Sequence, residues 1–146
     1  MKLFFEIEFP WEPVVKGRPR FTRSGIAYTP RDTKIAEAKI EQHLKFFFKK
    51  PATEKAIMIQ AEFHVPRLKT IKYEYPVTRK DLDNYLKLLM DSCNGIVFRD
   101  DCQVCKVEAA KYFTDRPRTI LRVFEFDSVD ETTLIYPIHC QEPIQS

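Results

Sequence analysis

The stretch from residue 79 to residue 101, RKDLDNYLKLLMDSCNGIVFRDD, carries five aspartates in a chain whose formal net charge is +3. Carboxylate oxygens are the ligands that Mg²⁺ prefers, and the ion keeps several waters when a few carboxylates hold it against a phosphate. Such a site can activate a water and stabilise a leaving oxygen, while a nearby lysine neutralises developing charge. The aspartates and lysine that could do this chemistry are Asp81, Asp83, Asp91, Asp100, Asp101 and Lys87.

Asp81 and Asp83 are two residues apart, which places them on opposite sides of a helix but on the same side of an extended chain. They can share a target only if the helix begins at about Asp83. The structural alternative is that one of them caps the helix and the other follows the preference of acids for a helix N-terminus.

Lys87 and Asp91 follow Asp83 at intervals of four, so the three residues line one polar face of the helix. The ordinary interpretation of this trio is a surface ion pair worth roughly 0.3 kcal/mol. Asp100 and Asp101 come in a short connection, where aspartate is a common turn residue. A short return could also bring them toward the sheet end where Asp81 and Asp83 lie. Spacing alone favours a metal site and these structural roles about equally.

The elements that must position these residues follow from apolar periodicity and from breaker residues. We expect an opening strand over 2–9, a helix capped by Thr29 with Pro30 at its first position, and a second strand over 57–65. A second helix then runs to the stop at Asn94 and Gly95, and strands over 103–113 and 119–126 follow. The first helix should bury Ile35, Ala38, Leu44 and Phe47 or Phe48, and the second Leu82, Tyr85, Leu86 and Leu89.

The order β-α-β-α-β-β predicts an α+β fold in one domain, a mixed β-sheet with two helices on one face. The domain should cover residues 1–126, and an acidic tail of unknown role should follow over 127–146. The tail region from Glu125 onward has five acids and no Lys or Arg, whereas residues 14–50 have ten cations against three acids. The front half is therefore a candidate polyanion-binding surface.

Basic residues of the front segment alternate with Phe21 and Tyr28. Cations in this arrangement can neutralise phosphates while an aromatic ring stacks on a base or wedges at a branch point. In the alternative, Phe21 anchors the loop and the cations are merely solvated. The cations concerned are Lys16, Arg18, Arg20 and Arg23.

Several function classes find no support in the sequence. The chain has no run of about 18 apolar residues and no signal-peptide pattern, so we expect a soluble cytoplasmic protein. Cys102 and Cys105 form a lone CxxC without a second pair, which favours structural or incidental thiols over zinc. Nucleotide-binding glycine loops and the GxSxG serine motif are missing.

The block from Asp81 to Val104 resembles the signature of the RusA family of Holliday junction resolvases. The matching pattern is DLDN from Asp81, Lys87, Asp91, the Asn94-Gly95 turn and DDCQV from Asp100. The front of the chain is also similar to the family, in FPW from Phe9, KGRPRF from Lys16 and YTP from Tyr28. The resemblance covers about residues 3 to 125.

The resemblance implies roles for particular residues. Asp81, Asp83 and Asp101 would bind Mg²⁺, for which Mn²⁺ can substitute, and Asp100 is a further candidate ligand. Lys87 would act with these three aspartates in catalysis, near the scissile phosphate. The candidates for DNA binding are Lys16, Arg18, Arg20, Arg23, Arg79 and Lys80.

The function implied is that of a Mg²⁺-dependent, structure-specific endodeoxyribonuclease in DNA recombination and repair. It would act as a homodimer that resolves four-way DNA junctions by paired symmetric nicks, leaving 5′-phosphate and 3′-hydroxyl ends. Association with the nucleoid through DNA and an origin in a phage or prophage are further expectations. The alternatives are a non-catalytic protein that binds branched DNA, a nuclease for other branched nucleic acids, and a structural metal-binding protein.

Overall fold

The structure, a computed structural model, describes residues 1–77 and 80–127. The prediction for Arg79 and the part of the acidic tail beyond Asp127 lie outside these residues. The expected order β-α-β-α-β-β is confirmed, with a short hairpin and a 3₁₀ turn added to it. The main elements are β1 (Lys2–Phe9), α1 (Arg31–Phe47), β4 (Ile57–Pro66), α2 (Leu82–Cys93), β5 (Val104–Thr114) and β6 (Arg118–Glu125).

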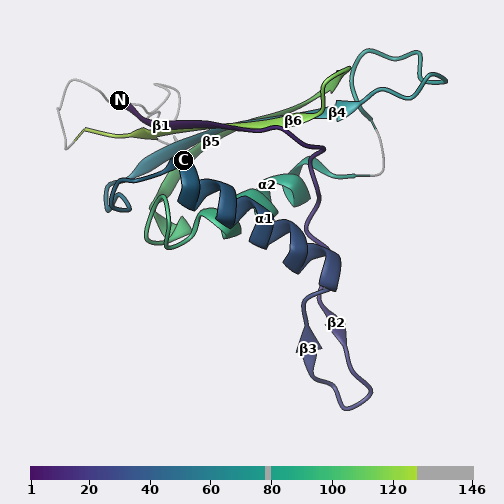
Figure 1. The fold of residues 1–146 in the computed structure, drawn as a ribbon, viewed down its shortest axis with the longest axis horizontal. Helices are drawn as coiled ribbons and strands as arrows, with labels where there is room; N and C mark the ends of the chain where they lie inside the picture. Colours follow the sequence, from purple (N-terminus) through teal and green to yellow (C-terminus); the bar gives the residue numbers. More distant parts are fainter. Residues whose placement is uncertain (78–79, 128–146) are drawn as a thin grey trace, which may run out of the picture.

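The main sheet has the strand order β1-β6-β4-β5. β5 runs parallel to β4, whereas β6 is antiparallel to both β1 and β4. Parallel strands need a long crossover connection, and α2 supplies it here between β4 and β5. Both helices cover the same face of the sheet (Figure 1), so the prediction of a mixed sheet with two helices on one face is confirmed.

The core lies between this sheet face and the two helices. Alternate residues of β4 point into it, and Ile59, Ala61 and Phe63 are all buried. The ring of Phe63 stacks on that of Tyr85 from α2, with 5.3 Å between the ring centroids. This packing fixes α2 on the sheet, and the helix in turn carries the candidate catalytic residues on its opposite face.

The buried face of α1 differs from the one predicted. Thr33, Ala36, Ile40 and Leu44 are buried, whereas Ile35 is 55% exposed. Ala38 and Phe47 are also exposed, and Phe48 is the buried member of the predicted pair. Apolarity alone misplaced the stripe because it leaves out Thr33, a polar residue that is buried and whose Oγ1 accepts a hydrogen bond from the backbone N–H of Gly17. The N-cap is Pro30 and not Thr29, and no side chain caps the helix.

In α2 the predicted core residues Tyr85 and Leu89 are buried, while Leu82 and Leu86 are partly buried. Leu88, Ser92 and Cys93 complete the buried face and were not predicted. None of the described helices is long and apolar enough to span a membrane.

The front segment contains a small hairpin where a loop was expected. Its strands are β2 (Arg20–Phe21) and β3 (Ala27–Tyr28), and Gly25 between them has a φ of 83°, a conformation that favours glycine. Every residue from 18 to 28 is exposed, and the hairpin projects from the body beyond the start of α1 (Figure 1).

Candidate active site and nucleic-acid interface

Asp81 and Asp83 lie at the start of α2. Asp81 is the residue before the helix and has extended backbone angles. This is the conformation that Asp81 needs if it is to share a target with Asp83. Its carbonyl oxygen accepts the first hydrogen bonds of the helix, but its carboxylate makes no capping hydrogen bond. Both carboxylates are exposed and make no ion pair with the described residues. The capping alternative therefore does not account for Asp81.

Lys87 lies between two aspartates from different segments. Its Nζ is 3.1 Å from Asp91 Oδ1, one turn further along α2, and 3.8 Å from Asp101 Oδ2. The expected polar face with Lys87 and Asp91 is therefore confirmed. A helical ion pair does not explain the contact with Asp101, because Asp101 lies in the DDCQV segment beyond the turn that follows α2. This contact holds the DDCQV segment against the helix that begins in DLDN.

Asp100 and Gln103 build the 3₁₀ turn η1 (Asp101–Gln103) that holds Asp101 in place. Asp100 Oδ1 accepts a hydrogen bond from Cys102 N at 3.1 Å, and Gln103 Oε1 accepts one from Asp100 N at 3.0 Å. Gln103 Nε2 also donates to the carbonyl oxygens of Thr53 and Lys55, at 2.9 and 2.8 Å. The DDCQ sequence is therefore a capping box tied to the segment before β4, and Asp100 has a structural role in it.

Asp100 and Asp101 influence each other's ionisation. The side-chain hydrogen bond with Asp100 raises the pKa of Asp101 above its ordinary value, and the charge of Asp91 acts in the same direction. The backbone hydrogen bond from Cys102 lowers the pKa of Asp100. Two neighbouring carboxylates beside one lysine form an acid group that an added positive charge would stabilise.

The expected convergence of three or four carboxylates is not present. Across residues 1–77 and 80–127, no three His, Cys, Asp or Glu side chains lie close enough together to hold a metal ion. The reason is topological. α2 starts after the carboxyl end of β4, and the parallel register pairs Ile57 with Val104, so the return to β5 lies at the amino end of both strands. Asp101 thus reaches Lys87 and Asp91, but does not join Asp81 and Asp83 in one cluster. The metal-ligand roles of Asp81, Asp83 and Asp101 stay a prediction.

Lys16 lies in this site and not on the outer surface of the basic segment. Its Nζ donates a hydrogen bond to Asp91 Oδ2 and is 3.6 Å from Glu37 Oε1 of α1. The hydrogen bond to Asp91 raises the pKa of Lys16. Burial would raise the pKa of Asp91, but the hydrogen bonds from Lys16 and Lys87 lower it overall. Sequence reasoning missed Glu37, because an acid on a helix face carries no signal of a partner 21 residues earlier.

The other candidates for DNA contact are exposed. Arg18, Arg20 and Arg23 lie on the projecting hairpin and make no ion pair with the described residues. Lys80 is exposed next to Asp81, and its carbonyl oxygen accepts a hydrogen bond from Lys111 Nζ at 3.0 Å. The structure places these cations on two different segments, the hairpin that precedes α1 and the residue just before α2.

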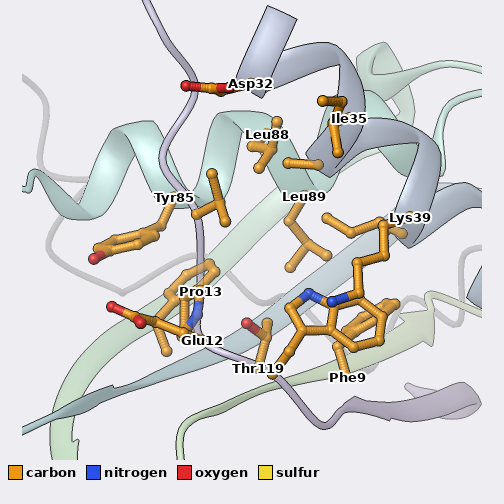
Figure 2. A pocket seen from close by; sticks show the side chains of 15 residues that line it. Phe9, Glu12, Pro13, Asp32, Ile35, Lys39, Tyr85, Leu88, Leu89 and Thr119 are labelled. Carbon is orange, nitrogen blue, oxygen red and sulfur yellow. The ribbon is translucent and has the colours of Figure 1, made fainter.

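An apolar groove of about 450 Å³ is lined by residues of α1, α2 and the sheet and does not include Lys87, Asp91 or Asp101. Trp11, Ile35 and Tyr85 contribute to its walls, and the segment around Glu12 and Pro13 crosses it (Figure 2). Tyr85, Leu88 and Leu89 line it from α2, on the face opposite to that of Lys87. Lys39 also lines the groove, and its Nζ lies over the Trp11 ring, 4.3 Å from the ring centre.

Comparison with known proteins identifies the family. The profile of the family described as Endodeoxyribonuclease RusA matches residues 10–124 of the 146. The chain belongs to the RusA family. A segment of 50 residues is 34% identical to "Uncharacterized protein YqaN" of Bacillus subtilis (strain 168), and it covers 34% of this chain and 35% of that protein. The RusA match includes α1, β4, α2 and β5, and hence all the acids and the lysine described above.

Proposed function

We propose that this RusA-family chain is a Mg²⁺-dependent, structure-specific endodeoxyribonuclease that resolves four-way DNA junctions by paired symmetric nicks. The observation that carries the proposal is Lys87, which contacts both Asp91 and Asp101 within a chain matched to an endodeoxyribonuclease family over residues 10–124. A lysine held between acids on an exposed surface is suited to a phosphate that arrives together with a cation.

The side chains present fit a hard divalent ion by their donor chemistry. Asp81 and Asp83 are exposed carboxylates that make no ion pair with the described residues, and Asp101 is an acid whose pKa is raised by its neighbour. Oxygen-only donors favour Mg²⁺, or Mn²⁺ in its place. We propose that Asp81, Asp83 and Asp101, which form no cluster in this structure, come together around the ion when it binds, with Asp100 as a further candidate ligand. When bound, the ion would supply activation of water and charge stabilisation at the phosphate.

The chain's own groups would do the rest of the work. Lys87 is 56% exposed, so its ammonium can approach a phosphate from solvent while Asp91 and Asp101 limit its directions. There it would stabilise the negative charge that develops during hydrolysis. Asp100 and Gln103 would keep Asp101 oriented through the capping box.

The projecting hairpin is proposed to grip a DNA arm. Arg18, Arg20 and Arg23 are free to contact phosphates, and Phe21 is 69% exposed, which suits stacking on bases at a branch point. Lys80, next to the start of α2, is proposed as a further contact, and so is Arg79. The sequence alternative in which Phe21 anchors the loop in the core is not supported by this exposure.

Paired nicks require two active sites, so we propose a homodimer that places one site on each side of the branch point. Two-fold symmetry would relate the two sites to strands of like polarity. Action on junctions during recombination and repair would associate the protein with the nucleoid in the cytoplasm.

The proposal is tested by cleavage of a fixed four-way junction, with and without Mg²⁺, by the wild type and by Asp83→Asn. We expect paired nicks by the wild type only with Mg²⁺, and loss of cleavage but not of binding in Asp83→Asn, because the variant retains the basic surfaces. A fork and a linear duplex serve as substrate controls. Full activity of Asp83→Asn would refute the metal-site assignment, and preference for the fork would refute junction resolution.

A further inference from the structure

Lys16 fastens the basic front segment to both helices. Its backbone N–H donates to the carbonyl oxygen of Asn84 in α2 at 3.0 Å, and its Nζ reaches Asp91 in α2 and Glu37 in α1. The next residue, Gly17, donates its N–H to Thr33 Oγ1 at 2.9 Å. Two consecutive residues thus make four polar contacts with the helices, in a stretch that the sequence shows only as loop.

The approach of this segment to α1 is close enough to require glycine. A Cβ added at Gly17 would lie 2.8 Å from Thr33 Oγ1 and 3.2 Å from Pro30 Cγ. Thr33 is buried and its hydroxyl is already engaged by the Gly17 N–H, so it cannot move aside without breaking that hydrogen bond. The position of Lys16 is therefore fixed by backbone packing as well as by its side chain.

Asp91 connects Lys16 to the candidate catalytic lysine. Lys16 binds its Oδ2 and Lys87 lies 3.1 Å from its Oδ1, so the two lysines share one carboxylate through different oxygens. Lys16 is only 28% exposed, whereas Lys87 is 56% exposed at the side chain and contacts Asp101 with the same ammonium. A long lysine side chain in solvent samples many rotamers, and an oriented carboxylate reduces their number.

We propose that Lys16 is a positioning residue, which orients Asp91 and through it holds the Lys87 ammonium beside Asp101, and that it is not a DNA-contacting cation. This inference rests on the proposed nuclease function. Lys16 would therefore differ in role from Arg18, Arg20 and Arg23, although its charge and its place in the sequence are similar to theirs. It also gives Asp91 and Glu37 a role, as the acids that hold Lys16.

The test compares Lys16→Met with the wild type in two measurements. In single-turnover cleavage at saturating junction and Mg²⁺, we expect the rate to fall about tenfold or more, because small misplacements of a catalytic group can cost up to about 10²-fold. In junction binding without cleavage, we expect the slope of log K against log salt to stay unchanged. Lys2→Met, which removes an exposed lysine at the start of β1 that makes no ion pair with the described residues, should leave both values unchanged.

The opposite pattern would overturn the inference. A slope reduced by about 0.9, with an unchanged rate at saturation, would mean that Lys16 itself neutralises a phosphate in the wild type. Asp91→Asn provides a second variant if Lys16→Met folds poorly, since it keeps the size of the side chain. We expect from it the same slower cleavage with an unchanged salt slope.

A thermodynamic cycle separates this inference from the proposed function. Urea unfolding is measured for Lys16→Met, Asp91→Asn and the double variant. The second substitution should lower the free energy of unfolding by less once the first is made. If the wild type cleaves no branched DNA, the proposed function fails while the cycle still tests the link between Lys16 and Asp91. Additive effects in the cycle would overturn this link even if cleavage is observed.

Discussion

His64 is a residue whose burial gives the stability of the fold a dependence on pH. It lies in β4 on the sheet face without helices, and its Nε2 is buried without a hydrogen-bond partner among the described residues. Burial lowers the pKa of His64 below 6.5, and the positive charge of Arg118 acts in the same direction. Glu62 at 3.8 Å and Glu8 oppose this shift, and Arg116 supports it.

This lowered pKa predicts weaker folding in mild acid. Because the unfolded chain binds a proton at His64 more readily than the folded chain, stability is complete above pH 6.5 and falls as the pH drops toward the lowered value. Urea unfolding at about pH 5 and about pH 7.5 measures the difference. His64→Gln cannot titrate and should show a smaller difference between the two pH values. Equal differences in the variant and the wild type would contradict the prediction.

Single residues of the site differ in how far the sequence reveals their place. The i,i+4 spacing of Lys87 and Asp91 predicts their contact, because a helix dictates it. Lys16 and Glu37 could not be placed in the site in this way, since their contact depends on how the front segment crosses α1 and α2. Charge alone grouped Lys16 with the arginines of the hairpin.

At the level of elements, the 3₁₀ turn before β5 depends on one glutamine. Gln103 accepts from Asp100 N and donates to the carbonyl oxygens of Thr53 and Lys55. Gln103→Ala removes all three hydrogen bonds, so we predict a decrease of roughly 1 to 3 kcal/mol in the free energy of unfolding. Cys102→Ala, which changes an exposed residue of the same turn, is the matched control and should cost little.

The activity of Gln103→Ala distinguishes two roles for the turn. If the capping box positions Asp101, the folded variant should also cleave more slowly at saturating junction. If the free energy of unfolding of Gln103→Ala equals that of the wild type within error, the turn does not need the glutamine.

The elements themselves were largely predictable, and their registers were not. Pro10, Pro66 and Asn94-Gly95 mark ends that the structure confirms within a residue or two. The hairpin of β2 and β3 was missed because two-residue strands leave no periodic pattern, although Gly25 marked a turn. The return of Asp101 to the amino end of β5 follows from parallel pairing, which the order of elements permits but does not impose.

At the scale of the whole molecule, the arginines proposed to bind DNA lie on the projecting hairpin and not in the folded core. We predict that replacement of Arg18, Arg20 and Arg23 by Gln weakens junction binding and lowers the salt slope by up to about 0.9 for each phosphate that is no longer neutralised. Because residues 18–28 are exposed, the melting temperature should change little. Binding titrations across a salt series and a thermal melt measure the two effects.

The matched control removes the same charge from the other end of α1. Lys45, Lys49 and Lys50 lie at or just after its last turn, and their replacement by Gln changes the net charge by the same amount. If both triple variants bind equally weakly, net charge and not the hairpin determines affinity.

The parallel pairing of β4 and β5 also has a consequence for solubility. Within the described part of the chain, β5 is an edge strand of 11 residues, and an entire crossover separates it from its partner β4. Such a strand pairs late during folding, and an open edge can recruit a strand from another molecule. Lys106, Glu108 and Lys111 place charges along it that a second strand would have to desolvate. These charges should keep partly folded chains apart until β5 has paired with β4.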